Sequence, residues 1–278
     1  MLAPANLLEA WIVKVGYMLM GDPRDTEGNV MAWQDFLAEA RDWGLQGVDI
    51  FPRYLDKAGT TVDAAVETIQ DLGLEVAVYC VPTDLVSADP AVREESLDRV
   101  RVYANKAVEL GVGHMFSHGG QHNNSGEDAL ARYIDGLQKA CDICAERDLL
   151  FSIENAGSLC HTADELVRCI EGVDRPNMRV TLDTANFIIA RDDPHEASRR
   201  LAAKTVHVHL KNLVDDPTRE GMPFRYCPPR DGKVDYPRVI EMLKAVDYDG
   251  YVSFEASGFP DATGDDGIRY VAEILADA

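Results

Sequence analysis

Residues 179–211, RVTLDTANFIIARDDPHEASRRLAAKTVHVHLK, contain a strand pattern, a helical pattern and a second strand pattern in close succession. Strands are predicted at Arg179–Asp183 and Val206–Lys211, with a helix between them at Pro194–Lys204. Two strands joined through a helix run parallel, because parallel neighbours in a sheet need a long crossover connection. This unit therefore predicts a parallel sheet covered by helices.

The same alternation extends outward over the chain of 278 residues. Strand patterns are predicted at Val13–Met18, Gly47–Phe51, Glu75–Val81, Gly113–Ser117, Leu150–Glu154, Arg179–Asp183, Val206–Lys211 and Tyr251–Glu255. Helical patterns are predicted at Ala32–Trp43, Val62–Leu72, Pro90–Leu110, Ala129–Arg147, Thr162–Ile170, Pro194–Lys204, Tyr236–Ala245 and Asp266–Leu275. Three of these predicted helices are followed directly by a glycine, namely Gly44, Gly73 and Gly111. Glycine most readily adopts the left-handed conformation that ends a helix.

Eight strand–helix units in this length predict an α/β fold, a single (β/α)8 TIM barrel over residues 1–278. An open, doubly wound sheet is the alternative arrangement of parallel strands. It is disfavoured as a dinucleotide-binding fold, because no G-x-G-x-x-G motif follows the first predicted strand.

The composition excludes several classes of protein. The chain is 46% hydrophobic and carries 48 acidic against 27 basic residues, a formal net charge of −21. Nucleic acids and anionic membrane surfaces attract cationic proteins, so we expect neither as a partner. The apolar segment Trp11–Met20 is too short to span a bilayer and contains Lys14. It is predicted as part of the first strand and not as a signal peptide, and we expect a cytoplasmic protein.

The cysteine pattern has two interpretations. Cys141 and Cys144 form a C-x-x-C pair, which occurs in redox and zinc sites. The pair lies inside a predicted helix and has no second C-x-x-C to complete a zinc site. We therefore predict that both are small buried hydrophobic residues.

Four predicted strands in the second half of the chain alternate apolar with polar residues. In a barrel, the apolar side chains then face the helices and the polar ones face the axis. Each polar face reaches an ionisable residue near the C-terminal end of its strand, which is where barrel enzymes place their active sites. These residues are Glu154, Asp183, a histidine of the His207-Val-His209 pair, and Glu255.

Such groups are costly to bury without partners, and a divalent cation among them removes that cost. Three carboxylates and one imidazole suit Mn²⁺, Mg²⁺, Co²⁺ or Zn²⁺. A single carboxylate at a strand end is more often solvated or caps a helix, and a single strand histidine is more often part of the core. Four such positions on consecutive strands favour a metal site.

Four segments then carry a family resemblance: Ile153-Glu-Asn-Ala-Gly157, Leu182-Asp-Thr-Ala-Asn-Phe187, His207-Val-His-Leu-Lys211 and Gly250-Tyr-Val-Ser-Phe-Glu255. In their order and spacing they resemble the xylose isomerase-like TIM-barrel superfamily, which contains sugar and sugar phosphate isomerases and epimerases. The resemblance extends from about Gly44 to the C-terminus. It implies that the metal ligands are Glu154, Asp183, His209 and Glu255, and that Glu154 and Glu255 are catalytic groups that exchange protons with the substrate.

The resemblance implies a divalent-metal-dependent isomerase or epimerase of a sugar or keto-polyol. A proton next to the carbonyl is removed and the ion stabilises the resulting enediolate. We expect Glu154 and Glu255 to come from opposite sides of the ring of strands and to flank the substrate. Loss of a β-hydroxyl from the same intermediate gives the alternative, a dehydratase or lyase. An endonuclease-like phosphodiesterase is disfavoured by the charge and the few histidines, and a non-catalytic subunit by the complete ligand set.

Candidate substrate-binding residues are His118, Asn186, Lys211 and Arg230. Asn186 stands where the family's ketose 3-epimerases carry a substrate-binding histidine, which weakens the transfer of that particular activity. Lys211 is predicted to point inward beyond His209, where it either polarises a substrate oxygen or pairs with a carboxylate. His118 is equally compatible with an ordinary loop histidine, and for Arg230, on the long segment after the seventh strand, a solvated loop arginine is the default interpretation. We expect a small sugar or polyol as partner; no interface pattern decides whether the chain forms a homo-oligomer.

Overall fold

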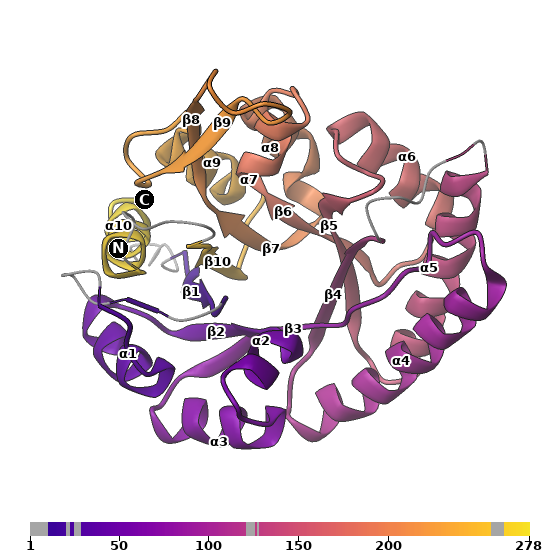
Figure 1. Ribbon diagram of the computed structural model, residues 1–278, viewed down its shortest axis with the longest axis horizontal. Coiled ribbons are helices and arrows are strands. Elements are labelled where there is room, and N and C mark those ends of the chain that lie inside the picture. Colours follow the sequence, from indigo (N-terminus) through magenta and orange to yellow (C-terminus); the bar gives the residue numbers. More distant parts are fainter. Residues whose placement is uncertain (1–10, 21–22, 25–28, 121–125, 127, 257–263) are drawn as a thin grey trace, which may run out of the picture.

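A computed structural model describes residues 11–278 except 21–22, 25–28, 121–125, 127 and 257–263. Within the described residues, eight parallel strands close into a barrel in the order β1-β10-β7-β6-β5-β4-β3-β2 (Figure 1). The strands are β1 (Lys14–Met18), β2 (Gly47–Ile50), β3 (Glu75–Cys80), β4 (His114–Gly119), β5 (Leu150–Gly157), β6 (Met178–Asp183), β7 (Thr205–Leu210) and β10 (Tyr251–Phe254). The predicted α/β barrel is therefore confirmed.

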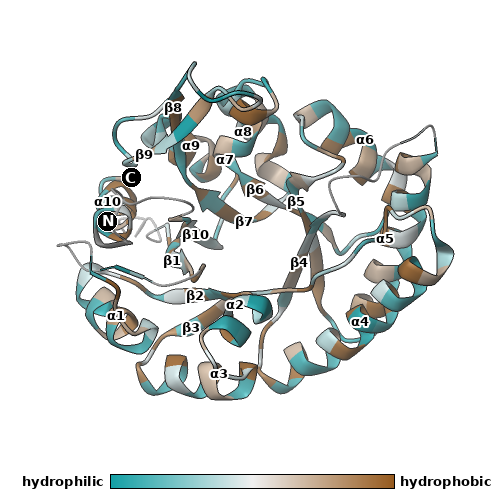
Figure 2. Ribbon diagram, in the orientation of Figure 1, coloured by the Kyte–Doolittle hydropathy of each residue, from teal (hydrophilic) through white to brown (hydrophobic). Residues whose placement is uncertain are grey.

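Helices form the outer layer around these strands (Figure 1). They are α1 (Trp33–Ala40), α2 (Pro52–Lys57), α3 (Val62–Asp71), α4 (Pro90–Glu109), α5 (Ala129–Ala145), α6 (Ala163–Val173), α7 (Thr184–Ile189), α8 (Pro194–Leu201), α9 (Tyr236–Lys244) and α10 (Gly264–Ala276), with 3-10 turns η1 (Arg41–Trp43) and η2 (Ala202–Lys204). Figure 2 shows polar and apolar residues mixed along the helices, as expected where one side of a helix packs on the strands and the other faces water. No helix in the described ranges combines the length and the apolar character that crossing a bilayer requires.

Helix α5 shows how the outer layer is built. Its buried side is made of Tyr133, Leu137, Ala140, Cys141 and Cys144, which recur at helical spacing. Both cysteines of the C-x-x-C pair are free thiols in this buried side. The prediction that they are small core residues is confirmed.

Four elements within the described residues had no counterpart among the predicted ones. Helices α2 and α7 begin within two residues of the end of a strand. Each is six residues long, which is too short to display a helical period. Strands β8 (Asn212–Asp215) and β9 (Phe224–Cys227) form a separate antiparallel hairpin after β7. The Asn212 side chain holds the base of this hairpin by donating to the carbonyl oxygens of Pro229 and Val234, both at 2.9 Å.

Candidate metal centre

The structure brings together Glu154, Asp183, His209 and Glu255. One ligand atom from each lies within 4.8 Å of the others, and all four side chains are buried. They are placed by β5, β6, β7 and the end of β10, which are consecutive around the barrel. Glu154 and Glu255 therefore stand on strands separated by two others, and they are not on opposite sides of the ring as expected. His209 lies between them, its Nδ1 2.7 Å from Glu154 Oε1 and 3.9 Å from Glu255 Oε2.

Asp183 is held in place by its neighbours along the chain and across the sheet. The side chain of Asn155 accepts from the backbone N–H of Asp183 and donates to its carbonyl oxygen, both at 2.9 Å. Asp183 Oδ1 also accepts from the backbone N–H groups of Ala185 and Asn186 at the start of α7. One carboxylate oxygen thus caps a helix, and the other, Oδ2, faces the cluster.

Lys211 is the basic member of the cluster. Its ammonium group lies 2.6 Å from Asp183 Oδ2 and donates to both oxygens of Glu255 at 2.9 and 3.0 Å. Of the two sequence-based alternatives, the structure shows the pairing with carboxylates. Burial disfavours the charged amine, but Asp183, Glu255 and Glu154 outweigh it and raise the pKa of Lys211, so the ammonium form persists at neutral pH.

The pKa values of Glu154 and Asp183 shift in opposite directions in this crowded site. Burial raises the pKa of Glu154, but the hydrogen bond and charge of His209, with the charge of Lys211, bring it down to about 2. Burial raises the pKa of Asp183 to about 7; Lys211 opposes this, and the negative charges of Glu255 and Glu154 add to it. A carboxyl group whose pKa is raised toward neutral pH in this way indicates that the site favours additional positive charge.

The donor set fits a divalent cation. Three carboxylates and an imidazole offer hard oxygen ligands and one nitrogen, and they converge within the separation that ligands of one ion require. Repulsion from Glu255 and Glu154 contributes to the raised pKa of Asp183, and a bound cation would relieve that repulsion. The residues present therefore suit a metal centre.

A pocket of about 220 Å³ opens next to the cluster. This is smaller than the pockets of roughly 300–1,000 Å³ that hold drug-sized ligands, which indicates a small molecule. Its walls differ, since Met18, Phe51 and Cys80 line it as part of a buried apolar group and Glu154 and Glu255 contribute charge. The apolar group consists of Met18, Phe51, Val78, Cys80 and Phe116. The residues lining the pocket are Met18, Met20, Phe51, Pro52, Arg53, Cys80, Pro82, His118, Glu154, Ala156, Asn186, Lys211 and Glu255.

Three of the four predicted substrate-binding residues, His118, Asn186 and Lys211, line this pocket. Arg230 does not. It is ion-paired with Glu273 on α10, and its guanidinium lies over the Tyr270 ring, 3.8 Å from the centroid. The structure thus directs Arg230 toward a helix of the outer layer, and we do not retain it as a substrate-binding candidate.

Asp49 and Arg53 belong to this region but were not singled out from the sequence. Asp49 is fully buried on β2 beneath His209. The alternation used for the other strands also applies to it, because Asp49 lies between the core residues Val48 and Ile50. Arg53 follows β2 in the short helix α2 and lines the pocket. No strand period extends to it, so the sequence carried no comparable signal.

A second polar group lies deeper in the barrel, where the side chain of His114 hydrogen-bonds to Ser152 Oγ at 2.7 Å. Burial lowers the pKa of His114 well below its ordinary value of 6.5, and the charge of His207 lowers it further. The folded protein therefore leaves His114 neutral at a pH where the unfolded chain binds a proton. Stability is lost as the pH falls below the unfolded-state pKa.

We expect His114→Gln to reduce this acid sensitivity. Between pH 7.5 and 5.0, the free energy of unfolding should fall by about 2 kcal/mol less in the variant than in the parent protein, because glutamine does not titrate. Urea denaturation at the two pH values, with EDTA present in both, measures the difference. Equal losses in the two proteins would show that His114 is protonated within the fold.

Comparison with known proteins agrees with this architecture. The family model described as xylose isomerase-like TIM barrel matches residues 37–277. An inosose dehydratase of Geobacillus kaustophilus is 30% identical over 139 residues, 46% of this chain and 45% of that protein, so the match spans less than half of that relative. A 3-dehydroshikimate dehydratase of Bacillus anthracis is 21% identical over 251 residues, 82% of this chain and 87% of that protein.

Among solved structures, a xylose isomerase-like TIM barrel protein from Mycobacterium smegmatis, in complex with magnesium, has a similar fold. It superposes with a TM-score of 0.73 and 18% identity over 96% of this chain and 98% of that one. The family model covers most of the chain, and the closed barrel of parallel strands agrees with it. The chain belongs to the xylose isomerase-like TIM-barrel family.

Proposed function

We propose that this protein is a divalent-metal-dependent dehydratase that removes water from a small keto-polyol or a related cyclic ketone. The observation that carries the proposal is the cluster of Glu154, Asp183, His209 and Glu255 beside a pocket that both glutamates line. The names of the sequence relatives support dehydration over the isomerisation or epimerisation first expected from the motifs.

Glu154, Asp183, His209 and Glu255 are the residues that would hold the cation. A divalent ion there would supply Lewis acidity, polarising the substrate carbonyl and stabilising negative charge that develops on its oxygen. The apolar wall on the opposite side of the pocket would exclude water from the reacting carbons.

The proton transfers are assigned to side chains in the pocket. Glu154 is ionised at neutral pH and takes the proton from the carbon next to the carbonyl. The electron pair left on that carbon forms the new carbon–carbon double bond and displaces the β-hydroxyl. His118, which pairs with Glu154 in the β4–β5 register and lines the same pocket, gives a proton to the departing oxygen, so that water leaves. Lys211 remains an ammonium group and orients Glu255.

Epimerisation begins with the same proton removal but ends differently. A second group must return the proton to the opposite face of the same carbon, and the hydroxyl must stay in place. Position 186, which carries a substrate-binding histidine in the ketose 3-epimerases, is asparagine here. This departure, with the names of the relatives, favours dehydration.

The reaction can be followed by proton NMR in D₂O. We expect the protein treated with EDTA and then supplied with Mn²⁺, Mg²⁺, Co²⁺ or Zn²⁺ to convert either inosose or 3-dehydroshikimate into a product one water molecule lighter, and the EDTA-treated protein to be inactive. Paramagnetic ions are removed before the spectra are recorded. A linear ketohexose serves as the comparison substrate. Deuterium incorporation with inversion and no water loss would establish an epimerase instead, and full activity in EDTA would exclude the metal centre.

A further inference from the structure

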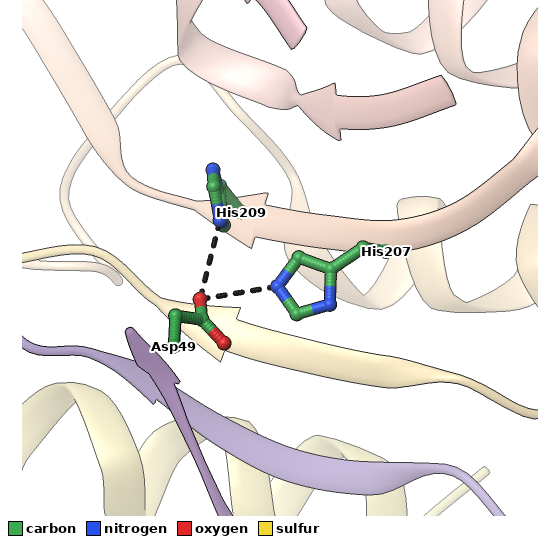
Figure 3. Close-up of side chains that lie close together, drawn as sticks. All are labelled: Asp49, His207 and His209. Atoms are coloured by element: carbon green, nitrogen blue, oxygen red, sulfur yellow. Dashed lines mark hydrogen bonds and ion pairs between the residues drawn. The ribbon is translucent and has the colours of Figure 1, made fainter. Parts of the chain in front are cut away.

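Asp49 lies between His207 and His209, the histidine of the candidate metal centre (Figure 3). Its Oδ2 accepts a hydrogen bond from His207 Nε2 at 3.0 Å and lies 3.2 Å from His209 Nε2. Its Oδ1 accepts from Ser253 Oγ at 2.9 Å. Asp49, His207 and His209 are each at most 1% exposed, so water does not compete for these contacts.

The two nitrogens of His209 face different partners. Nδ1 is directed toward Glu154 and Glu255, within the cluster that would hold the metal. Nε2 lies 3.2 Å from Asp49 Oδ2, an ion-pair contact that is not aligned as a hydrogen bond (Figure 3). A neutral imidazole has one N–H and one lone pair, and an ionised carboxylate only accepts hydrogen bonds. Glu154 beside Nδ1 and Asp49 beside Nε2 each favour hydrogen on the nitrogen that they face. A cation bound at Nδ1 would take the place of the hydrogen there, and Asp49 then favours the tautomer with hydrogen on Nε2 and the lone pair on Nδ1.

We propose that Asp49 is a positioning residue that fixes the ring orientation and the tautomer of His209, so that His209 Nδ1 is available as a metal ligand. The inference rests on the metal centre of the proposed function. Asp49 contacts neither the metal nor the substrate in this role. It acts through His209, and its effect is to be found first in metal affinity.

The fold supports this position of Asp49. The regular alternation along β2 turns Asp49 inward between Val48 and Ile50, because the extra residue at the register shift between β2 and β3 is Ala77 on β3. Gly16 on β1 is the register partner of Ser253, and a Cβ at Gly16 would lie only 2.1 Å from Ser253 Oγ. Glycine at this position thus leaves space for the hydroxyl that holds the second oxygen of Asp49.

Asp49, His207 and His209 also have the composition of a second metal site, since one ligand atom from each lies within 4.8 Å of the others. The contacts favour a positioning network instead. A single oxygen of Asp49 already lies within 3.2 Å of a nitrogen of each imidazole. The number of ions bound per chain distinguishes the two arrangements.

The test compares Asp49→Asn and Asp49→Ala with the same two substitutions at Asp142, an exposed aspartate of α5 that is ion-paired with Arg175, as matched controls. Asparagine keeps the size and one acceptor oxygen but loses the charge, whereas alanine removes the contact. We expect Mn²⁺ affinity, measured by calorimetry on the full chain, to fall about 10- to 100-fold in Asp49→Ala and by a smaller factor in Asp49→Asn. Both Asp142 variants, which leave Asp49 and His209 untouched, should bind within about threefold of the parent.

The tautomer is read directly by ¹⁵N NMR of the histidine rings in the Zn²⁺-loaded parent protein. We expect His209 to carry its hydrogen on Nε2, and the resonance of that N–H to shift in Asp49→Asn, which keeps the packing. Thermal unfolding of each metal-free variant reports the purely structural effect separately.

Several results would overturn the inference. Unchanged Mn²⁺ affinity in both Asp49 variants would show that His209 needs no such partner, and hydrogen on Nδ1 in the Zn²⁺-loaded parent would contradict the assigned tautomer. Two ions per chain, with one lost in Asp49→Ala, would establish a second metal site. In each case a parent protein that still binds metal and dehydrates its substrate leaves the proposed function intact. A parent that binds no metal would refute both.

Discussion

Glu154→Gln is expected to lower kcat by about 10³-fold or more while the protein still unfolds cooperatively. The substitution keeps the shape of the side chain but removes the base that accepts the substrate proton, a role that contributes roughly 10²- to 10⁴-fold to catalysis. It also replaces an ionised ligand of the metal centre by a neutral amide. Steady-state kinetics at saturating metal measure kcat, and thermal denaturation measures the fold.

The control is Glu146→Gln, which makes the same chemical change on an exposed side chain at the end of α5. We expect its kcat to match that of the parent. Full activity in Glu154→Gln would remove Glu154 from the proton transfer and leave Glu255 as the base. Loss of cooperative unfolding would instead show that the carboxylate is needed for the fold.

The second large effect is expected at His209. His209→Ala should weaken metal binding by at least about 10²-fold, since even the partners of ligating histidines are worth about 10- to 100-fold in affinity. His207→Ala should weaken it by less than about tenfold, because His207 contacts Asp49 and lies outside the group of four ligands. Calorimetric titration of both EDTA-treated variants with Mn²⁺ gives the comparison.

These two variants form a matched pair. Both histidines are on β7, both are buried, and their ring centroids are 5.0 Å apart. General destabilisation would therefore affect metal binding in both variants alike. A larger loss in His207→Ala would identify the first histidine as the ligand and would contradict the assignment of His209.

The sequence by itself determined the barrel and the set of four candidate ligands. The reason is that strand and helix periods are local: a period of two on β5, β6 and β7 already assigns Glu154, Asp183 and both histidines of the His207-Val-His209 pair to the same inward face. The family resemblance then selects His209 from the pair. Closure of a parallel barrel then brings the C-terminal ends of the strands to one side, where the end of β10 adds Glu255. The structure places the four ligand atoms within 4.8 Å of one another.

The tertiary structure decided which partners each side chain has. His207 and Asp49 are separated by 158 residues, and Ser253 and Asp49 by 204, so no local period relates them. Packing also decided the partner of Arg230, which was expected at the substrate. Helix α10 supplies Glu273, and Arg230 is ion-paired with it instead. The direction of a strand residue is a property of the backbone nearby, whereas the group it meets depends on barrel closure, register and packing between distant segments.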